Sequence, residues 1–487
     1  MRPFKAVFLA VTASVLALGT ARADVTPHPL FTDNVVLQQG TDVVIWGKAD
    51  ADEAVSVTLE QKTPNSASAA GTSATADKDG KWAVKLPAQK AGTGYTLTLK
   101  GKNTVELKNV AVGEVWVCSG QSNMEWSVNI SEDPAKVKEG AKNPNLRLFT
   151  VQNRPAAQPI EDQADLKHFT KWSVSGPDTV GNFSAVAYHF GQKLQKELDV
   201  PVGLIHTSWG GTPAQAWASA EALAAEPSLK YYVDSVKGGT AGPNTPGALY
   251  NAMIHPLLKF KVKGAIWYQG ESNTGRAYEY RTLLPTMIKD WRKRFDCELP
   301  FMIVQLAPFG NGKGNSNGVT YAELRDAQVY TAKTLPKTGL AVITDIGNET
   351  DIHPKPKGPV GERLALAALG TEYGKKIEYS GPMFKDVKFE SGTATVSFSH
   401  VGGGLVAKDG DPVGFTLAGK DGKFLPAKAT IKGDTVQLTS EFVPEPVAVR
   451  YGWVNFANPT LNLFNKEGLP ASPFRTDDAP YTTQPKK

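Results

Sequence analysis

Two short Gly-x-Ser-Asn segments follow apolar runs, and each could present a serine hydroxyl for chemistry. Residues 119–124 contain Ser122, and residues 269–273 contain Ser272. Such segments predict tight turns directly after buried strands. A serine hydroxyl becomes a nucleophile only beside a base, because it is almost wholly protonated at neutral pH. One such turn is more often structural, whereas two at strand ends indicate a catalytic rim, meaning the edge of the sheet at which the strands end. The residues alone leave open which serine attacks.

The base is expected to be a histidine, and His353 is the best candidate of the seven. The other six fall in helical patterns, in a buried strand, or in loops and β-rich segments: His28, His168, His189, His206, His255 and His400. His353 follows a strand end in a polar loop, with Asp351 two residues before it. Side chains at i and i+2 of an extended segment share a face. Asp351 could therefore orient the ring, as the acid of a Ser-His-Asp triad does.

A third segment, residues 208–212, follows an apolar strand and carries Gly210 and Gly211. Glycines there could present a backbone N–H to a developing oxyanion. No Gly-Lys-Ser/Thr follows, which argues against a phosphate loop. The chain has no CxxC, HExxH or histidine cluster, so we expect no metal and no cofactor. Its two cysteines, Cys118 and Cys297, could pair or remain free thiols.

The elements that must hold these residues alternate between strands and helices over residues 109–378. The expected strands cover residues 111–118, 146–150, 202–207, 264–268, 301–306 and 340–344. The expected helices cover residues 184–198, 278–295, 322–335 and 360–373. This alternation predicts a mostly parallel sheet with helices on both faces. Ligands bind such sheets at the carboxyl ends of the strands.

Short alternating runs flank this region and predict two β-rich modules. Residues 24–108 are interpreted as a small β-sandwich and residues 379–487 as a second β-rich domain. Residues 63–76 are rich in Ser, Ala and Thr, and are interpreted as a long hairpin loop, with a flexible linker as the alternative.

The first 23 residues have the three parts of a secretory signal peptide, with an apolar run at residues 6–18 and cleavage expected after Ala23. That run is too short to span a bilayer. We therefore expect an exported protein, periplasmic or secreted, with no membrane span in the mature chain. The net charge of +5 falls to +2 without Arg2, Lys5 and Arg22. No basic block occurs, so no nucleic-acid partner is expected.

Three motifs resemble the signatures of the sialate O-acetylesterase family: residues 113–124, 267–273 and 351–354. Residues 30–38, 202–205 and 465–475 are similar to it as well, so the likeness covers nearly the whole mature chain. The family belongs to the SGNH-hydrolase superfamily. The resemblance therefore implies an α/β fold, with a flavodoxin-like three-layer α/β/α domain around a parallel sheet.

By that resemblance Ser122 is the nucleophile and His353 is the base. The superfamily usually carries Asp-x-x-His, whereas this chain has Asp-x-His. The orienting carboxylate is therefore Asp351 or, as the alternative, Asp345 at a strand end. Ser272 is not expected to attack.

The resemblance also implies a set of oxyanion donors. They are the Ser122 N–H, an N–H of Gly210 or Gly211, and the side-chain amide of Gln269 or Asn273. Gln121 and Glu271 are expected to support this rim, Glu271 through hydrogen bonds.

These observations predict a serine esterase that removes O-acetyl groups from carbohydrates through an acyl-enzyme. One alternative is a glycosidase that uses Glu271 with Asp351 or Asp345 as paired carboxylates. Another is a non-catalytic glycan-binding protein. The expected partner is an acetylated mono-, oligo- or polysaccharide, with sialic acid, xylan and xyloglucan as equally reasonable carriers.

Overall fold

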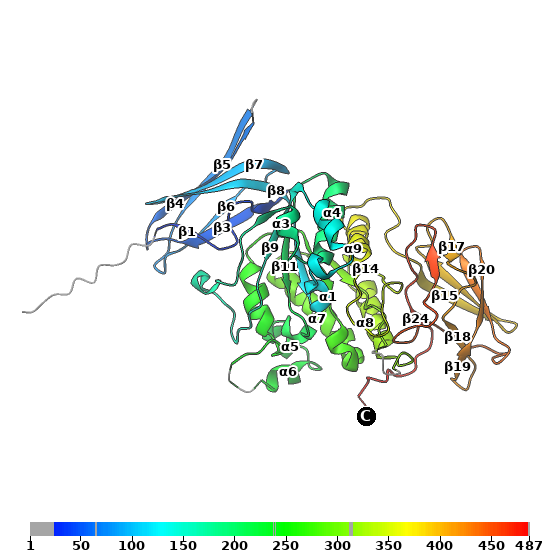
Figure 1. Ribbon diagram of the computed structural model, residues 1–487. Helices are drawn as coiled ribbons and strands as arrows, with labels where there is room; N and C mark the ends of the chain where they lie inside the picture. The colour runs from blue at the N-terminus through cyan, green and yellow to red at the C-terminus, as the bar shows by residue number, and fades with distance from the viewer. Residues whose placement is uncertain (1–23, 64–65, 237, 239, 311–314, 486–487) are drawn as a thin grey trace, which may run out of the picture.

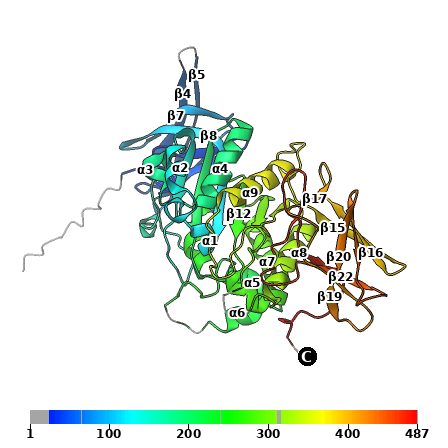
Figure 2. The same cartoon turned by 45° about the vertical axis from the view of Figure 1, so that its right-hand side comes forward.

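The computed structural model describes residues 24–485 apart from 64–65, 237, 239 and 311–314. The predicted signal peptide lies outside the described residues. A central α/β region carries one β-rich part at its N-terminal end and another at its C-terminal end (Figure 1). Figure 2 shows the two β-rich parts on different sides of the central region. No helix in the described part of the chain combines the length and apolarity needed to span a bilayer.

The largest sheet of the described chain has eleven strands, and seven of them form the central α/β layer in the order β10-β9-β11-β8-β12-β13-β14. Their bounds are β8 Thr104–Gly120, β9 Asn143–Thr150, β10 Ser173–Ser175, β11 Val202–Ser208, β12 Gly264–Tyr268, β13 Phe301–Val304 and β14 Thr338–Ala341. All pairings are parallel except that of β10 with β9. β8 lies between β11 and β12, so its carboxyl end lies in the middle of the rim.

Successive residues of these strands enter different cores, as the period of two requires. Val117 packs into one hydrophobic cluster, whereas Trp116 and Cys118 pack into the other. Helices α4, Ala185–Leu198, and α9, Gly358–Thr371, cover the second face, and α7, Ala277–Arg294, and α8, Thr320–Thr334, cover the first. The three-layer prediction is confirmed, and each of the four predicted helices begins and ends within two residues of its expected bounds.

The N-terminal part is built from β1 Thr26–Pro27, β2 Val36–Gln38, β3 Val43–Lys48, β4 Ala54–Thr63, β5 Ser66–Thr75, β6 Lys81–Leu86 and β7 Gly92–Lys100. The interpretation of residues 63–76 as a loop is wrong, because β5 pairs with β4 over ten residue pairs. β8 pairs with β7 and then continues into the central sheet. One strand thus crosses the boundary predicted between residues 108 and 109 and is shared by the two parts.

The C-terminal part has its own hydrophobic core and two four-stranded sheets. One contains β15 Met383–Glu390, β16 Thr393–Ser399, β20 Lys428–Lys432 and β21 Thr435–Thr439. The other contains β18 Phe415–Ala418, β19 Phe424–Pro426, β22 Ala448–Tyr451 and β24 Phe474–Arg475. β17 Leu405–Ala407 pairs with β23 Leu463–Asn465.

Short helices occupy connections of the central region: α1 Ser122–Glu125, α2 Pro134–Glu139, α3 Pro177–Val180, α5 Ala220–Ala225 and α6 Lys230–Asp234. The two cysteines are both free, Cys118 buried in β8 and Cys297 exposed.

Candidate active site

Ser122 is the first residue of α1 and follows the carboxyl end of the central strand β8. The turn requires Gly120, which has a φ of 145°. A Cβ at this position would lie 2.1 Å from the carbonyl oxygen of Tyr268 in β12. The Gln121 N–H donates to that same oxygen at 3.0 Å. The neighbouring strand therefore fixes the turn, and Ser122 is left half-buried at the rim.

His353 lies beside this serine, with 2.9 Å between its Nε2 and the Ser122 Oγ. The Trp126 ring stacks on the imidazole with 4.6 Å between centroids and 16° between planes. Burial lowers the pKa of His353, the Lys357 ammonium lowers it further, and Asp351 opposes both. The imidazole is therefore neutral at pH 7 and able to accept a proton. Among the described residues, no histidine lies within hydrogen-bond distance of the second serine.

Asp351 contacts His353 mainly through the backbone. Its Oδ1 accepts the His353 N–H at 2.9 Å, while the same oxygen lies 3.9 Å from the ring Nδ1. The ring distance exceeds that of a hydrogen bond. The alternative, Asp345, forms two bonds with Arg363 at 2.6 and 2.8 Å and has no contact with His353 in the described part of the chain. The geometry thus favours Asp351 as the carboxylate beside the ring.

The glycines after β11 lie directly against the serine. A Cβ added to Gly210 would lie 3.2 Å from the Ser122 Cβ. The Gly210 N–H is already bonded to Glu125 Oε2 at 2.6 Å. Gly211 has a φ of 75°, and a Cβ added to it would meet no atom within 4 Å. Among the residues that the structure describes, none accepts a hydrogen bond from the backbone N–H of Ser122 or Gly211, so both groups are free for an incoming oxygen.

Gln269 and Asn273 reach the rim but are buried and bonded to one another. Gln269 Nε2 donates to Asn273 Oδ1 at 2.7 Å and to Gln121 Oε1 at 3.1 Å. Asn273 Oδ1 also accepts the Ala214 N–H at 3.0 Å, and its Nδ2 donates to Gln215 at 3.2 Å. An amide nitrogen carries two hydrogens. The Gln269 amide is therefore fully used, whereas one Asn273 N–H is uncommitted.

Gln121 joins the two serine turns. Its Oε1 accepts the backbone N–H groups of Gly270 at 3.4 Å and Ser272 at 3.2 Å. The side chain predicted as a support thus bonds across from one turn to the other, and the second serine turn contributes backbone rather than a hydroxyl.

A buried polar cluster beneath the serine contains Glu271, which was expected to act through hydrogen bonds, together with Asn123 and Lys357, which the sequence did not indicate. Asn123 donates to Glu271 Oε1 at 2.5 Å and to the carbonyl oxygen of Ile352 at 3.0 Å, and it accepts a hydrogen bond from Lys357. Asn123 and Lys357 are 0% and 1% exposed. Burial raises the pKa of Glu271 and lowers that of Lys357 to about 7. The cluster ties the residue after the nucleophile to the residue before His353.

Trp126 and Lys357 were not among the residues predicted for the site, and only Trp126 had a signal in the sequence. Trp126 lies four residues after Ser122, and positions four apart in a helix share a face. Lys357 had none, because its place in the cluster depends on three segments that are distant in the chain.

Comparison with known proteins places these features in a family. Residues 112–369 match the model of a carbohydrate esterase family described as sialic acid-specific acetylesterase. The human sialate O-acetylesterase is 30% identical over 482 residues, which cover 91% of this chain and 90% of that protein. The rat enzyme of the same name is 32% identical over 421 residues, covering 74% and 76%. The crystal structure of a carbohydrate acetylesterase from Xanthomonas citri is 39% identical, with a TM-score of 0.83, and the match covers 93% of this chain and 100% of that one.

Proposed function

Because the chain belongs to the carbohydrate esterase family of sialic acid-specific acetylesterases, we propose that it acts through Ser122 as nucleophile and His353 as base. Its activity is the hydrolysis of O-acetyl esters on carbohydrates. The observation that carries the proposal is the 2.9 Å contact between His353 Nε2 and Ser122 Oγ. A nucleophile and base within hydrogen-bond reach is the geometry that this chemistry needs.

In the first half of the reaction, His353 Nε2 takes the Ser122 proton as Oγ attacks the acetyl carbonyl carbon. The tetrahedral intermediate then collapses, the bond to the sugar oxygen breaks, and His353 returns the proton to that oxygen. In the second half, His353 activates a water that attacks the acetyl group on Ser122. Acetate leaves, and the serine regains its proton.

The negative charge on the carbonyl oxygen needs donors that are already in place. We assign this role to the Ser122 and Gly211 N–H groups, because neither has another acceptor. Of the two candidate amides, Asn273 is the better side-chain donor, since one of its N–H groups is uncommitted. Gln269 is assigned a supporting role through its bond to Asn273.

Asp351 is proposed to hold the loop of His353 through the backbone bond and to stabilise the imidazolium through its charge. The 3.9 Å ring distance is compatible with this role, because catalytic hydrogen bonds are often long before substrate binds. Asp345 is less suited, since Arg363 neutralises it.

The glycosidase alternative is disfavoured by the position of Glu271. Its Oε1 is bonded to Asn123, and its Oε2 is buried without a partner. A general acid must reach the glycosidic oxygen, and this carboxyl group lies beneath the rim.

For location, we propose that residues 1–23 are removed on export and that the mature enzyme is periplasmic or secreted. The three-part pattern of that segment supports this. Sequencing the N-terminus of the mature protein is the test: Asp24 is the expected first residue, and an intact Met1 would refute export by this route.

The catalytic assignment is tested with Ser122→Ala and, as matched control, Ser272→Ala. Acetate release from acetylated sialic acids, xylan and xyloglucan is measured for each. We expect Ser122→Ala to lose roughly 10³-fold or more, with folding unchanged by circular dichroism, and the control to keep its activity. Retained turnover in Ser122→Ala would refute the assignment, and the wild-type profile identifies the preferred sugar.

A further inference from the structure

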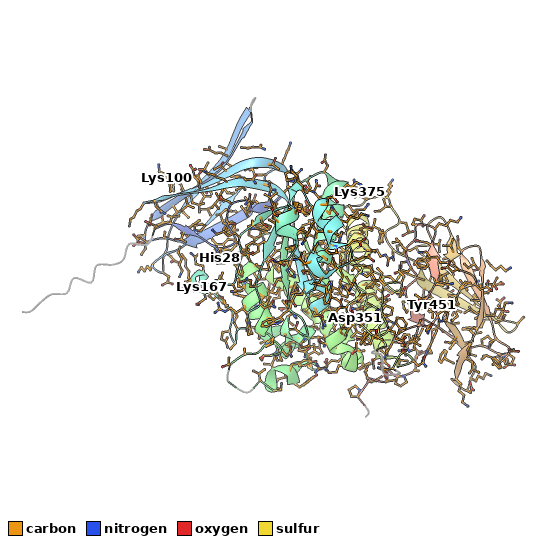
Figure 3. All side chains as sticks on the ribbon, in the orientation of Figure 1. His28, Lys100, Lys167, Asp351, Lys375 and Tyr451 are labelled. Carbon is orange, nitrogen blue, oxygen red and sulfur yellow. The ribbon has the colours of Figure 1, made fainter. Side chains whose placement is uncertain are left out.

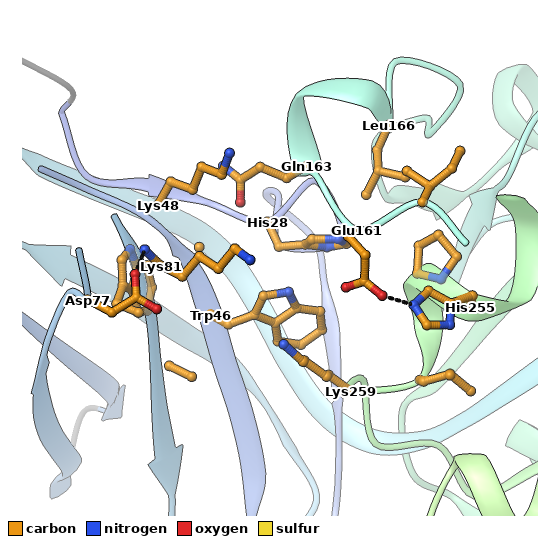
Figure 4. Close-up of a pocket in the computed structure, with 16 residues that line it drawn as sticks. His28, Trp46, Lys48, Asp77, Lys81, Glu161, Gln163, Leu166, His255 and Lys259 are labelled. Atoms are coloured by element: carbon orange, nitrogen blue, oxygen red, sulfur yellow. Dashed lines mark hydrogen bonds and ion pairs between the residues drawn. The ribbon is translucent and has the colours of Figure 1, made fainter. Parts of the chain in front are cut away.

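A cavity of about 500 Å³ lies where the N-terminal β-rich part meets the central region (Figure 4). Strand β3 and the β6 region line one side, and residues 160–166 and 255–259 line the other. Its volume is within the roughly 300–1,000 Å³ range of small-ligand sites. In Figure 3 His28, which lines this cavity, lies well apart from Asp351 of the catalytic loop.

Two neighbouring rings, His28 and Trp46, lie in the lining with 4.7 Å between centroids and 37° between their planes. His28 is 5% exposed, and its Nδ1 accepts the Leu30 N–H at 3.3 Å. The ring proton therefore sits on Nε2. Burial, aided by the nearby Lys259 charge, lowers the pKa of His28 to about 3, so the ring is neutral at pH 7. Across the described residues, neither His28 Nε2 nor Trp46 Nε1 has an acceptor, which leaves two ring N–H donors unused.

Lys81 and Lys259 bring positive charge to these rings. Figure 4 shows their side chains extending toward His28 and Trp46 from different sides. Both are exposed, and neither forms an ion pair within the part of the chain that the structure describes.

The other titratable side chains of the lining each have at least one partner within the described chain. Lys48 pairs with Asp162 at 2.6 Å, and His255 pairs with Glu161 at 2.7 Å. Asp77 Oδ1 accepts two backbone N–H groups of its own turn at 2.9 and 2.8 Å. The cavity is therefore left with unpaired ammonium groups and ring donors, and a ligand that supplies a carboxylate would match them.

We propose that this cavity binds a carboxylate-bearing sugar residue of a glycan, separately from the ester that the serine cleaves. The ammonium groups of Lys81 and Lys259 pair with the carboxylate, and the N–H groups of the two rings donate to sugar oxygens next to it. The free Glu161 oxygen and the Gln163 amide suit hydroxyl groups. Such a site would retain an acidic glycan while its acetyl groups are removed elsewhere on the enzyme.

The test is calorimetric titration of the full-length Ser122→Ala protein, which binds without turnover. The probes are a glucuronate-bearing xylo-oligosaccharide, a sialylated oligosaccharide and a neutral xylo-oligosaccharide. We expect one acidic probe to bind, which identifies the source of the carboxylate, and the neutral probe to bind at least about tenfold more weakly. Affinity is expected to fall with added salt, because the lysines are exposed.

The variants Lys81→Gln and Lys259→Gln are each expected to weaken binding by about tenfold, the loss of one charge-assisted hydrogen bond. The matched control is Lys167→Gln, an exposed lysine outside the lining. In the otherwise wild-type chain, neither cavity variant should change hydrolysis of a small aryl acetate. Equal binding of acidic and neutral probes, no binding of either acidic probe, or unchanged affinity in both cavity variants would overturn the proposal. Failure of the serine assignment would leave these binding results unaffected.

Discussion

Replacing Lys357 by Met should change how the stability of the fold depends on pH. Lys357 is 1% exposed, and no carboxylate lies within 4.0 Å of its ammonium in the described chain. Its Nζ bonds to Asn123 and lies 5.8 and 5.6 Å from the ring centroids of Trp126 and Tyr268. Burial lowers the pKa of Lys357 from 10.5 to about 7, while Glu271 and Asp351 oppose the change.

The magnitude follows from that difference. At about 1.36 kcal/mol per pH unit, the fall from 10.5 to about 7 corresponds to about 5 kcal/mol. Between these two pH values the unfolded chain binds more protons at this group than the folded chain does. The free energy of unfolding therefore rises with pH in that window. Above pH 10.5 the whole gain in the free energy of unfolding is present. The gain decreases as the pH falls and is lost once the pH has fallen through about 7.

Urea unfolding of the wild type and of Lys357→Met at pH 6.5, 8 and 9.5 measures this contribution. From pH 6.5 to 9.5 the wild type should gain about 3 kcal/mol relative to Lys357→Met. Lys355→Met, at an exposed position two residues away, is the control and should follow the wild type. Parallel pH dependences in the wild type and Lys357→Met would refute the reasoning, whatever their absolute stabilities.

Three further predictions concern activity. Burial and the Lys357 charge lower the pKa of His353, so the acid limb of kcat/KM should lie below pH 6.5 and move upward in Lys357→Met; a pH–rate profile checks both. Asp351→Asn should lower kcat by about 10- to 100-fold, less than the roughly 10⁴-fold loss for a buried triad aspartate, because Asp351 is half exposed. Asp345→Asn should leave kcat unchanged and lower the melting temperature. A loss of kcat in Asp345→Asn with none in Asp351→Asn would instead identify Asp345 as the orienting carboxylate. Gly210→Ala should lower kcat by about tenfold or more while the protein still folds, because its Cβ would meet the Ser122 Cβ at 3.2 Å; unchanged steady-state kinetics would contradict this.

Much of the fold was predictable because its signal is local. The buried strands and the long helices of the central region each carry their own periodicity, which neighbouring residues make visible. Residues 66–75 are a strand although they show no such pattern, because the facing strand β4 supplies ten pairings that no local window contains. The continuous strand β8 was missed for a similar reason, since its two halves pair with different strands and carry different burial patterns.

In the site, too, the residues with a local signal could be predicted and those without one could not. Ser122 and His353 could be named as candidates because each follows a strand end, and strand ends of a parallel sheet converge. The choice of Ser122 over Ser272 came from the family resemblance, because both serines follow strand ends. The bond of Asn123 to both Glu271 and Lys357 joins positions more than 140 residues apart, in three separate segments. A buried lysine has the same sequence appearance as an exposed one, so only the assembled structure reveals the cluster.

The central claim is that acetyl transfer passes through Ser122. Acid quenching of the enzyme during turnover of an acetylated glycan, followed by mass spectrometry of the peptide that contains Ser122, tests this most directly. The mechanism predicts an acetylated Ser122 peptide in the wild type and none in His353→Ala or Ser122→Ala. Acetate release at the wild-type rate by Ser122→Ala, or an acetyl group found on Ser272 instead, would contradict it.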